Sequence, residues 1–194
     1  MRIHGGFGAR TGRVPHTVVG CRATLGTVAL HEWTVAGALV ETADGVLLVR
    51  NVRHGGDEDW STPGGVIDAD DVSLLDGLTR EVAEETGLRV SEWSGPLYEV
   101  HTYALDLGWH MRCEVHLAVA FEGDLSICDP DGIVVEAVLV PHDQLAERLA
   151  TGHPWVREPL GEWLDERWEP GCGRGFHYEV RGRHLGEMRV VRQS

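Results

Sequence analysis

The sequence predicts an α/β protein in which a mixed β-sheet lies between helices. Three observations lead to this fold class. Apolar residues alternate along several segments, as they do in half-buried strands, and the clearest of these segments runs from Met111 to Phe121. One amphipathic helix is expected after the first strands, and two more helices are expected near the C-terminus. Strands and helices in this order fit a mixed sheet covered by helices.

The first part of the chain predicts an arm followed by a hairpin. Residues 1–30 contain scattered glycine and arginine with little periodicity, so we expect an N-terminal arm that could contain one strand within 17–30. Residues 33–41 and 46–50 are predicted strands, because Ala43-Asp44-Gly45 between them is a turn sequence. Residues 51–62 are predicted to form a polar loop.

A helix is predicted from about residue 72 to residue 86. Either Ser73 or the pair Asp70-Asp71 can cap its N-terminus, and Gly87 ends it. Its expected apolar stripe consists of Leu75, Leu78 and Val82. Gly77 costs about 1 kcal/mol in a helix interior relative to alanine. A glycine at this point predicts that another backbone segment comes close to the helix.

The remaining chain predicts three strands, two helices and a hairpin. The strands cover 97–105, 111–121 and 132–140. One helix begins at Pro141 and ends near Leu149, and the second covers 155–168, where Pro159 could bend it. Residues 170–194 contain two alternating apolar segments that predict the hairpin. We therefore divide the chain into an arm (1–30), a main domain (31–169) and a C-terminal extension (170–194).

Composition excludes several classes of protein. The 194 residues carry a formal net charge of −14, which argues against a protein that binds nucleic acid polymers through a basic face. No segment approaches the roughly 20 apolar residues of a membrane span, and no signal peptide is recognisable. The four cysteines form no C-x-x-C pair and are expected to be reduced. These features predict a cytoplasmic protein with a small-molecule partner and no membrane partner.

Three carboxylates gather on the helix predicted over 72–86. Glu81, Glu84 and Glu85 stand at positions i, i+3 and i+4, so they project from one side of that helix. Like charges at this spacing repel one another, and a divalent cation neutralises them. Oxygen ligands without interleaved cysteine or histidine suit Mg²⁺ or Mn²⁺ rather than Zn²⁺. The sequence therefore predicts a metal site on this helix.

The stretch from Gly65 to Leu88 resembles the signature of the Nudix hydrolases, G-x5-E-x7-R-E-U-x-E-E-x-G-U, in which U is aliphatic. The second half matches at every fixed position from Arg80 onward. The first half departs, because Asp71 stands where the family has glutamate, and eight residues rather than seven separate it from Arg80. We refer to residues 65–88 as the box.

The resemblance implies the α/β/α sandwich of that family and a reaction in which water attacks phosphorus in a diphosphate. It also implies roles for residues of the box. The carbonyl of Gly65 and the carboxylates of Glu84 and Glu85 would hold the metal. Glu81 would be a further ligand or the general base.

The resemblance also assigns a supporting part of the box. Arg80 would orient the carboxylates by pairing with the acidic loop before the helix. Asp71 is the matching loop carboxylate, and Asp68 and Asp70 are rivals for this role. The extra residue between Asp71 and Arg80 would let the shorter aspartate side chain advance toward the arginine.

Family members often carry a further acid outside the box. Glu136, which precedes an apolar strand, is our candidate for it, and Glu114 is the alternative; each could equally be a surface residue. Arg50 and Arg53 could reach substrate phosphates or belong to a solvated loop. Trp60 could stack on a base or pack in the core.

The spacing of the histidines does not predict a second metal site. His101, His110 and His116 are spaced irregularly around the strands, and zinc would require a tighter cluster.

The function expected from the resemblance is metal-dependent cleavage of a nucleoside diphosphate derivative, such as a nucleotide sugar or an ADP-ribose-like molecule. The products would be a nucleoside monophosphate and phosphorylated X, where X is the second moiety. The alternatives are a (d)NTP pyrophosphohydrolase and a non-catalytic Nudix-fold module that binds nucleotides. Our preference over (d)NTPs rests on length, because the C-terminal excess could shape a pocket or a homodimer contact.

Overall fold

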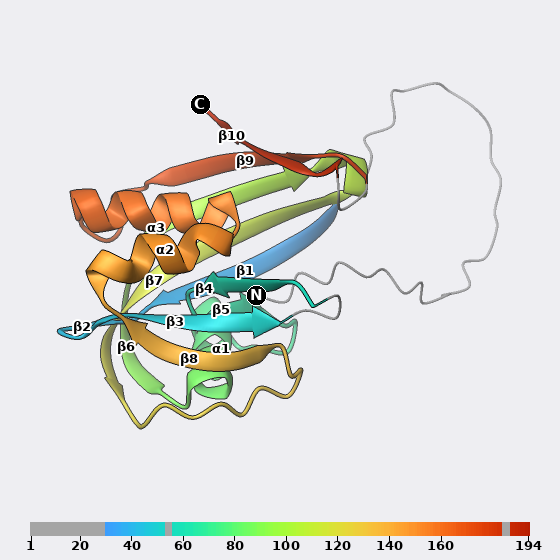
Figure 1. Cartoon of the computed structure of the whole chain (residues 1–194). Coiled ribbons are helices and arrows are strands. Elements are labelled where there is room, and N and C mark those ends of the chain that lie inside the picture. Colours follow the sequence, from blue (N-terminus) through green and yellow to red (C-terminus); the bar gives the residue numbers. More distant parts are fainter. Residues whose placement is uncertain (1–29, 53–55, 184–186) are drawn as a thin grey trace, which may run out of the picture.

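The computed structural model describes residues 30–52, 56–183 and 187–194, and its strands form two sheets (Figure 1). The larger sheet has six strands in the order β10-β9-β6-β7-β1-β5. These strands are β1 (His31–Leu39), β5 (Gly64–Val66), β6 (Arg89–Ala104), β7 (Trp109–Glu122), β9 (Gly175–Arg181) and β10 (Arg189–Gln193). β1 runs parallel to β7 and β6 runs parallel to β9, whereas the other neighbours are antiparallel. The sheet is therefore mixed, as predicted.

The smaller sheet is built around β3. Its strands are β2 (Glu41–Thr42), β3 (Gly45–Val52), β4 (Glu58–Ser61) and β8 (Val134–Val140). The strand order is β2-β3-β4, and β8 pairs with β3 as well; all three partners run antiparallel to β3. β4 corrects the prediction of an irregular loop over 51–62. A four-residue strand carries little periodicity of its own, so its pairing with β3 was not visible in the sequence.

Helices cover both faces of the larger sheet. They are α1 (Leu74–Thr86), α2 (Leu145–Arg148) and α3 (Pro154–Glu166), with short 3₁₀ segments η1 (Leu105–Leu107), η2 (His142–Gln144) and η3 (Leu149–Thr151). α2 and α3 lie over one face (Figure 1), where Leu145, Leu160 and Trp163 join a core with Val35 and Met111. α1 packs in a second core through Leu78 and Val82. Helices thus enclose a mixed sheet, which confirms the predicted fold class.

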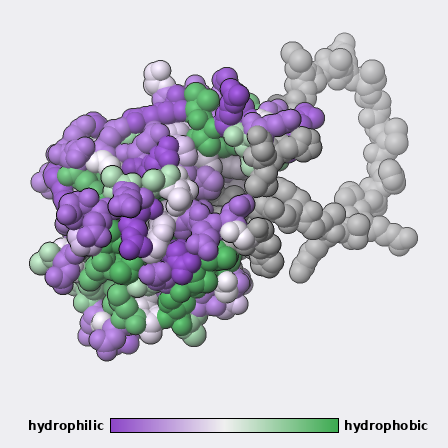
Figure 2. Space-filling model, viewed as in Figure 1, coloured by the Kyte–Doolittle hydropathy of each residue, from purple (hydrophilic) through white to green (hydrophobic). Residues whose placement is uncertain are grey.

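Hydrophilic and apolar residues are distributed unevenly over the surface. Figure 2 shows hydrophilic residues over much of the face seen in Figure 1, with apolar residues gathered in its lower part, where Figure 1 places β8. No helix in the described ranges combines the length and the apolar character that crossing a membrane requires.

Three element predictions are corrected by non-local packing. β6 begins at Arg89 rather than at residue 97, because its register with β7 shifts between Ser94 and Tyr98, so that Pro96 lies within the strand. A further register shift near Glu92 interrupts the pairing with β7, and Val119, which continues the alternating apolar residues of the segment 111–121, is 50% exposed. Leu75 is 36% exposed, while Leu74 packs against the core instead.

The C-terminal region adds two strands to the larger sheet. β9 and β10 are an antiparallel pair, and β9 also pairs with β6. Phe176, Tyr178 and Val180 of β9 are buried in the core beneath α3. Residues 170–194 therefore share a core with the preceding elements. The possible strand within 17–30 lies outside the described residues.

Candidate active site

The box helix α1 has a defined beginning and end. The Oγ atom of Ser73 accepts a hydrogen bond from the backbone N–H of Asp76 at 3.2 Å, so Ser73 rather than Asp70 or Asp71 is the cap. Gly87 ends the helix in the left-handed region at φ 79°, and its N–H donates to the carbonyl of Ala83. These two caps fix the register that places the carboxylates of the helix beside β5.

Arg80 connects the acidic loop to the helix. Its Nε and Nη2 atoms donate to the two oxygens of Asp71 at 3.2 and 3.0 Å, which is a bidentate pair. Its Nη1 atom donates to Glu81 at 2.7 Å and to Glu84 at 3.2 Å. The guanidinium group therefore holds three carboxylates, one from the loop and two from α1.

Among the acids of the loop, Asp71 forms the closest ion pair with Arg80. Asp68 approaches Arg80 only at 3.5 Å, and its side chain is 56% exposed, against 11% for Asp71. The Asp71 carboxylate also accepts the backbone N–H of Asp68 at 2.9 Å, which closes the loop. The hydrogen bond from Arg80 lowers the pKa of Asp71, and the hydrogen bond from Asp71 raises the pKa of Arg80. Both groups are therefore held in their charged forms.

Gly77 makes room for this loop acid. A Cβ atom at this position would lie 2.6 Å from Oδ2 of Asp71 and 2.9 Å from Cδ1 of Ile67. The close approach expected at Gly77 is present, but it is made by side chains of the loop rather than by another backbone. The missing methyl group thus lets Asp71 reach across the first turns of α1 to Arg80.

β5 lies directly against two of the helix carboxylates. A Cβ atom on Gly65 would lie 2.5 Å from Oε2 of Glu81, so only glycine fits there without displacing that carboxylate. The backbone N–H of Gly64 donates to Glu85 at 2.8 Å. Both Glu81 and Glu85 are buried. The structure therefore brings the predicted metal ligands and Gly65 to one place, where α1 crosses β5.

Burial raises the pKa of Glu85 to about 7. The negative charges of Glu81 and Asp129 raise it further, whereas the hydrogen bond from Gly64 acts in the opposite direction. A carboxylate in these surroundings loses its proton readily only when a positive charge reaches it. A bound divalent cation would supply that charge.

Asp129 is a site residue that the sequence did not reveal. It belongs to the segment after β7, which runs beside the end of α1: the backbone N–H groups of Ser126 and Cys128 donate to the backbone carbonyls of Thr86 and Glu84, both at 2.8 Å. Its own carboxylate accepts the N–H groups of Ile133 and Val134. The surrounding Asp-Pro-Asp-Gly sequence indicates only a turn, so no local signal points to the box.

The donor set at the box suits Mg²⁺ or Mn²⁺. All the candidate ligands are oxygens, from the carbonyl of Gly65 and the carboxylates of the helix, and two of those acids, Glu81 and Glu85, are buried. Within residues 30–52, 56–183 and 187–194, however, no three metal-binding side chains already converge on one point. Arg80 instead bridges Glu81 and Glu84. An ion would have to draw these two side chains away from Arg80, while Asp71 continues to hold the guanidinium group.

The predicted acids outside the box are engaged elsewhere. Glu136 on β8 accepts a hydrogen bond from Arg50 on β3 at 2.9 Å, and Arg50 also donates to Glu58 at 3.1 Å. Glu114 pairs with Arg112 at 2.6 Å and with His116 at 3.1 Å. Because Glu136, Glu114 and Arg50 are engaged in these ion pairs, the geometry does not support their predicted roles in the site, which stay predictions.

Arg53 and Trp60 are the remaining residues predicted to contact the substrate, and the structure describes only Trp60. Arg53 lies outside the described residues. Trp60 is 9% exposed and belongs to the core beneath α3, and the guanidinium group of Arg148 lies 5.0 Å from the centre of its ring. Base stacking by Trp60 therefore stays a prediction, and core packing is what the structure shows.

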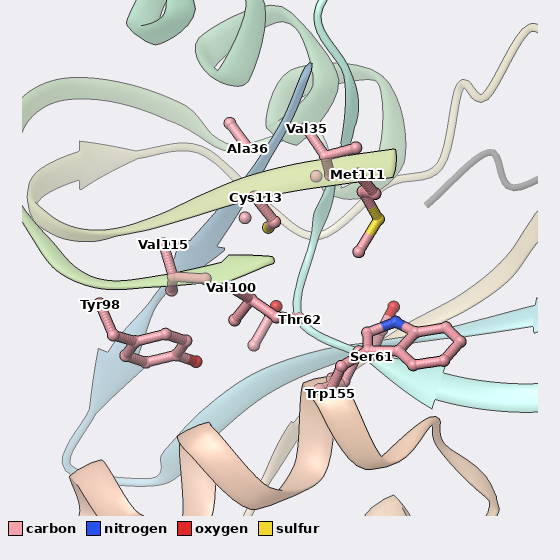
Figure 3. A pocket seen from close by; sticks show the side chains of 13 residues that line it. Val35, Ala36, Ser61, Thr62, Tyr98, Val100, Met111, Cys113, Val115 and Trp155 are labelled. Atoms are coloured by element: carbon pink, nitrogen blue, oxygen red, sulfur yellow. The ribbon is translucent and has the colours of Figure 1, made fainter. Parts of the chain in front are cut away.

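A small cavity lies between the larger sheet and the first turn of α3 (Figure 3). Its volume is about 30 Å³, which is room for one water molecule and far too little for a nucleobase. Tyr98 and Trp155 line it, and the buried Nε1 atom of Trp155 has no hydrogen-bond partner among the described residues. A base could enter this space only if α3 moved away from the sheet.

Comparisons with known proteins found a family model that covers the box. The family model of the NUDIX domain matches residues 31–164, which include the whole box. A MutT NUDIX hydrolase from Burkholderia pseudomallei has a similar structure, with a TM-score of 0.57, 24% identity, and coverage of 68% of this chain and 97% of that one. No curated protein sequence matched the chain.

Two further solved structures are similar. A NUDIX hydrolase from Nitrosomonas europaea has a TM-score of 0.57 and 21% identity, over 73% of this chain and 94% of that one. A MutT protein from Bacillus halodurans has a TM-score of 0.54 and 22% identity, over 81% and 97%. At these identities the likeness concerns the fold alone.

Proposed function

The chain belongs to the NUDIX domain family, and from this premise we propose that it is a Mg²⁺- or Mn²⁺-dependent hydrolase of nucleoside diphosphate derivatives. The family match confirms the resemblance of residues 65–88 to the Nudix signature. The observation that carries the proposal is the arrangement at α1, where Arg80 gathers three carboxylates and Glu85 is buried beside Gly64.

Each residue of this arrangement has a distinct task. Glu84 and Glu85 would hold the ion, which would supply the positive charge that neutralises the diphosphate oxygens. Asp71 holds Arg80, and Arg80 orients Glu81 and Glu84 until an ion binds. Water then attacks one phosphorus, the bond from that phosphorus to the bridging oxygen breaks, and the proton of the water passes to a carboxylate.

Glu81 is the residue that we assign to this proton. It is buried, and it lies against the glycine of β5. Glu81→Gln should lower kcat by about 10²–10⁴, the usual contribution of a general base. A loss of only a few-fold would move the role outside the box. Asp129 would then be the first candidate, because its charge reaches Glu85, whereas Glu136 is bound by Arg50.

The substrate class rests on the C-terminal part of the chain. β9 and β10 follow the family match, which ends at residue 164, and extend the sheet beyond it. This additional structure favours a substrate with a second moiety X, such as a nucleotide sugar or an ADP-ribose-like molecule. The second candidate is a (d)NTP pyrophosphohydrolase. Two of the similar structures are named MutT, but their sequence identity to this chain is too low to indicate its substrate.

A non-catalytic module that binds nucleotides is the second class of function. The departure at Asp71 is its only support, and the geometry weakens that support, because Asp71 forms a bidentate pair with Arg80. A binding module would also have no need for Glu81, Glu84 and Glu85 on one side of a helix.

A substrate panel tests the proposal. The full chain is incubated with nucleotide sugars, ADP-ribose and (d)NTPs, each with Mg²⁺ and with Mn²⁺, and the products are separated by ion-exchange chromatography. We expect a nucleoside monophosphate and phosphorylated X. Release of pyrophosphate from a triphosphate alone would support the (d)NTP pyrophosphohydrolase. Binding without cleavage of any compound would support the non-catalytic module and reject the enzyme.

A further inference from the structure

Aromatic rings from three strands lie side by side on the larger sheet, outside the box. The ring centre of His110, on β7, lies 4.3 Å from that of Tyr103 and 5.4 Å from that of His101, both on β6. His177 of β9 stacks on the other side of His101 at 5.1 Å. The planes differ by at most 12° within these pairs. His101 and His110 therefore meet edge to edge, because their ring centres are 5.4 Å apart while two of their nitrogens are only 3.2 Å apart.

Strand pairing explains this stack. His101 is the register partner of His177 on β9, and Tyr103 is the partner of His110 on β7. Along these strands the alternate residues Val100, Met111 and Phe176 enter the core under α3, so the rings occupy the opposite face of the sheet. The spacing in the sequence gave no hint of this cluster, because β9 supplies one member from more than 60 residues away.

Two ring nitrogens of the stack face each other. Nδ1 of His101 and Nε2 of His110 are 3.2 Å apart. Imidazole nitrogens that bind one divalent transition metal at about 2.0–2.1 Å, with an angle of about 90–110° between them, are separated by roughly 3.0–3.4 Å. The observed separation lies in this range. The two nitrogens share a hydrogen bond, so metal binding would require loss of the proton between them and rotation of both rings toward the ion.

A carboxylate lies near the outer nitrogen of each of the two rings, and the one at His110 is within hydrogen-bond distance. Oε2 of Glu32 lies 2.5 Å from Nδ1 of His110, and Oε2 of Glu99 lies 3.6 Å from Nε2 of His101. Metal-binding histidines commonly donate their second N–H to a carboxylate, which fixes the ring and makes the free nitrogen a better ligand. Arg112 pairs with Glu99 at 3.2 Å and keeps that carboxylate in position.

We propose that His101 and His110 are a two-histidine chelate for a divalent transition metal that prefers imidazole, such as Zn²⁺ or Ni²⁺. No third protein ligand converges on this point among the described residues, so water completes the coordination. The site is separate from the carboxylates of the box, which favour Mg²⁺ or Mn²⁺, because its donors are nitrogens. Desolvation, together with His177 and His110, lowers the pKa of His101, and this favours the neutral form that binds metal.

Calorimetric titration of the full chain with Ni²⁺, in the presence of saturating Mg²⁺, tests the proposal. We expect His101→Ala and His110→Ala each to remove one bound Ni²⁺ per chain. His142→Ala is the matched control, because His142 also pairs with a glutamate, Glu41, but has no facing imidazole nitrogen. It should leave the number of bound ions unchanged.

A milder variant and a spectrum cover the case in which an alanine variant fails to fold. Glu32→Gln, at a residue whose side chain is 67% exposed, should weaken this one site by about 10-fold to 100-fold. In the unmodified chain, the imidazole NMR signals of His101 and His110 should be the first to broaden at low Ni²⁺. Unchanged stoichiometry in the folded variants, unchanged affinity in Glu32→Gln, or broadening confined to other histidines would each overturn the proposal.

Discussion

Arg80 is the residue through which the loop and the helix of the box act on each other. It binds Asp71 with two hydrogen bonds and Glu81 and Glu84 with one each. The aspartate in place of the family's glutamate has the shorter side chain, and the absence of a side chain at Gly77 lets it come close enough. The space left at Gly77 therefore compensates for the shorter side chain of Asp71.

Asp71→Ala should lower kcat by roughly 10-fold or more, as is usual when a group that orients metal ligands is lost. Its Tm should stay close to that of the unmodified chain, because Asp71 lies in a loop outside both cores. Asp68→Ala is the matched control, since Asp68 touches the same guanidinium group only at 3.5 Å. If Asp68→Ala shows the larger loss in steady-state kinetics, our assignment of the loop partner is wrong.

Glu85 should make the stability of the metal-free chain depend on pH. Its pKa is raised to about 7 in the folded protein, from an ordinary value of 4.5. Between these values the folded chain keeps a proton that the unfolded chain has lost, so the free energy of unfolding falls as the pH rises through this window.

Thermal unfolding in EDTA at pH 5 and pH 7.5 measures this effect. Glu85→Gln should show a smaller fall in Tm between the two values than the unmodified chain does. Glu84→Gln should retain the full fall, because the Glu84 side chain is 29% exposed and Glu85 remains in place. Equal falls for the unmodified chain and Glu85→Gln would show that another group causes the dependence.

At the scale of elements, α1 shows which features a sequence reveals by itself. Its cap at Ser73, its end at Gly87 and the shared side of its carboxylates follow from hydrogen bonds and spacings within a few residues. These features were predictable. The choice of Leu74 over Leu75 for the core was not, because it depends on how the helix is rotated against the sheet.

The two interior glycines of α1 and α3 offer a paired test. Gly77→Ala places a methyl group 2.6 Å from the Asp71 carboxylate and should lower kcat by about as much as Asp71→Ala, roughly 10-fold. Gly161→Ala in α3 meets nothing within 4 Å, and should stabilise the protein by about 0.5–1 kcal/mol without a change in kcat. Denaturant unfolding and steady-state kinetics measure both variants. Unchanged activity of Gly77→Ala would show that the loop tolerates the displacement.

At the scale of the whole molecule, the sequence predicted the fold class and most of the strands, because alternation and turn residues are local signals. It did not predict that β9 joins β6, that β4 pairs with β3, or that Asp129 comes near Glu85. The contacts of β9 and of Asp129 join segments that only the complete topology brings together, whereas β4 is too short to show a periodicity of its own. The same reason explains why the stack of His101, His110 and His177 was not foreseen.

The central claim is that the box carboxylates hold a catalytic divalent metal ion. Its most direct test is the shift in Tm on addition of Mg²⁺ or Mn²⁺, measured for the unmodified chain and for the double variant Glu84→Gln/Glu85→Gln. Because an ion that binds only the folded state stabilises it, the unmodified chain should show a clear rise in Tm. The double variant should show none. An equal rise in both proteins would contradict the claim.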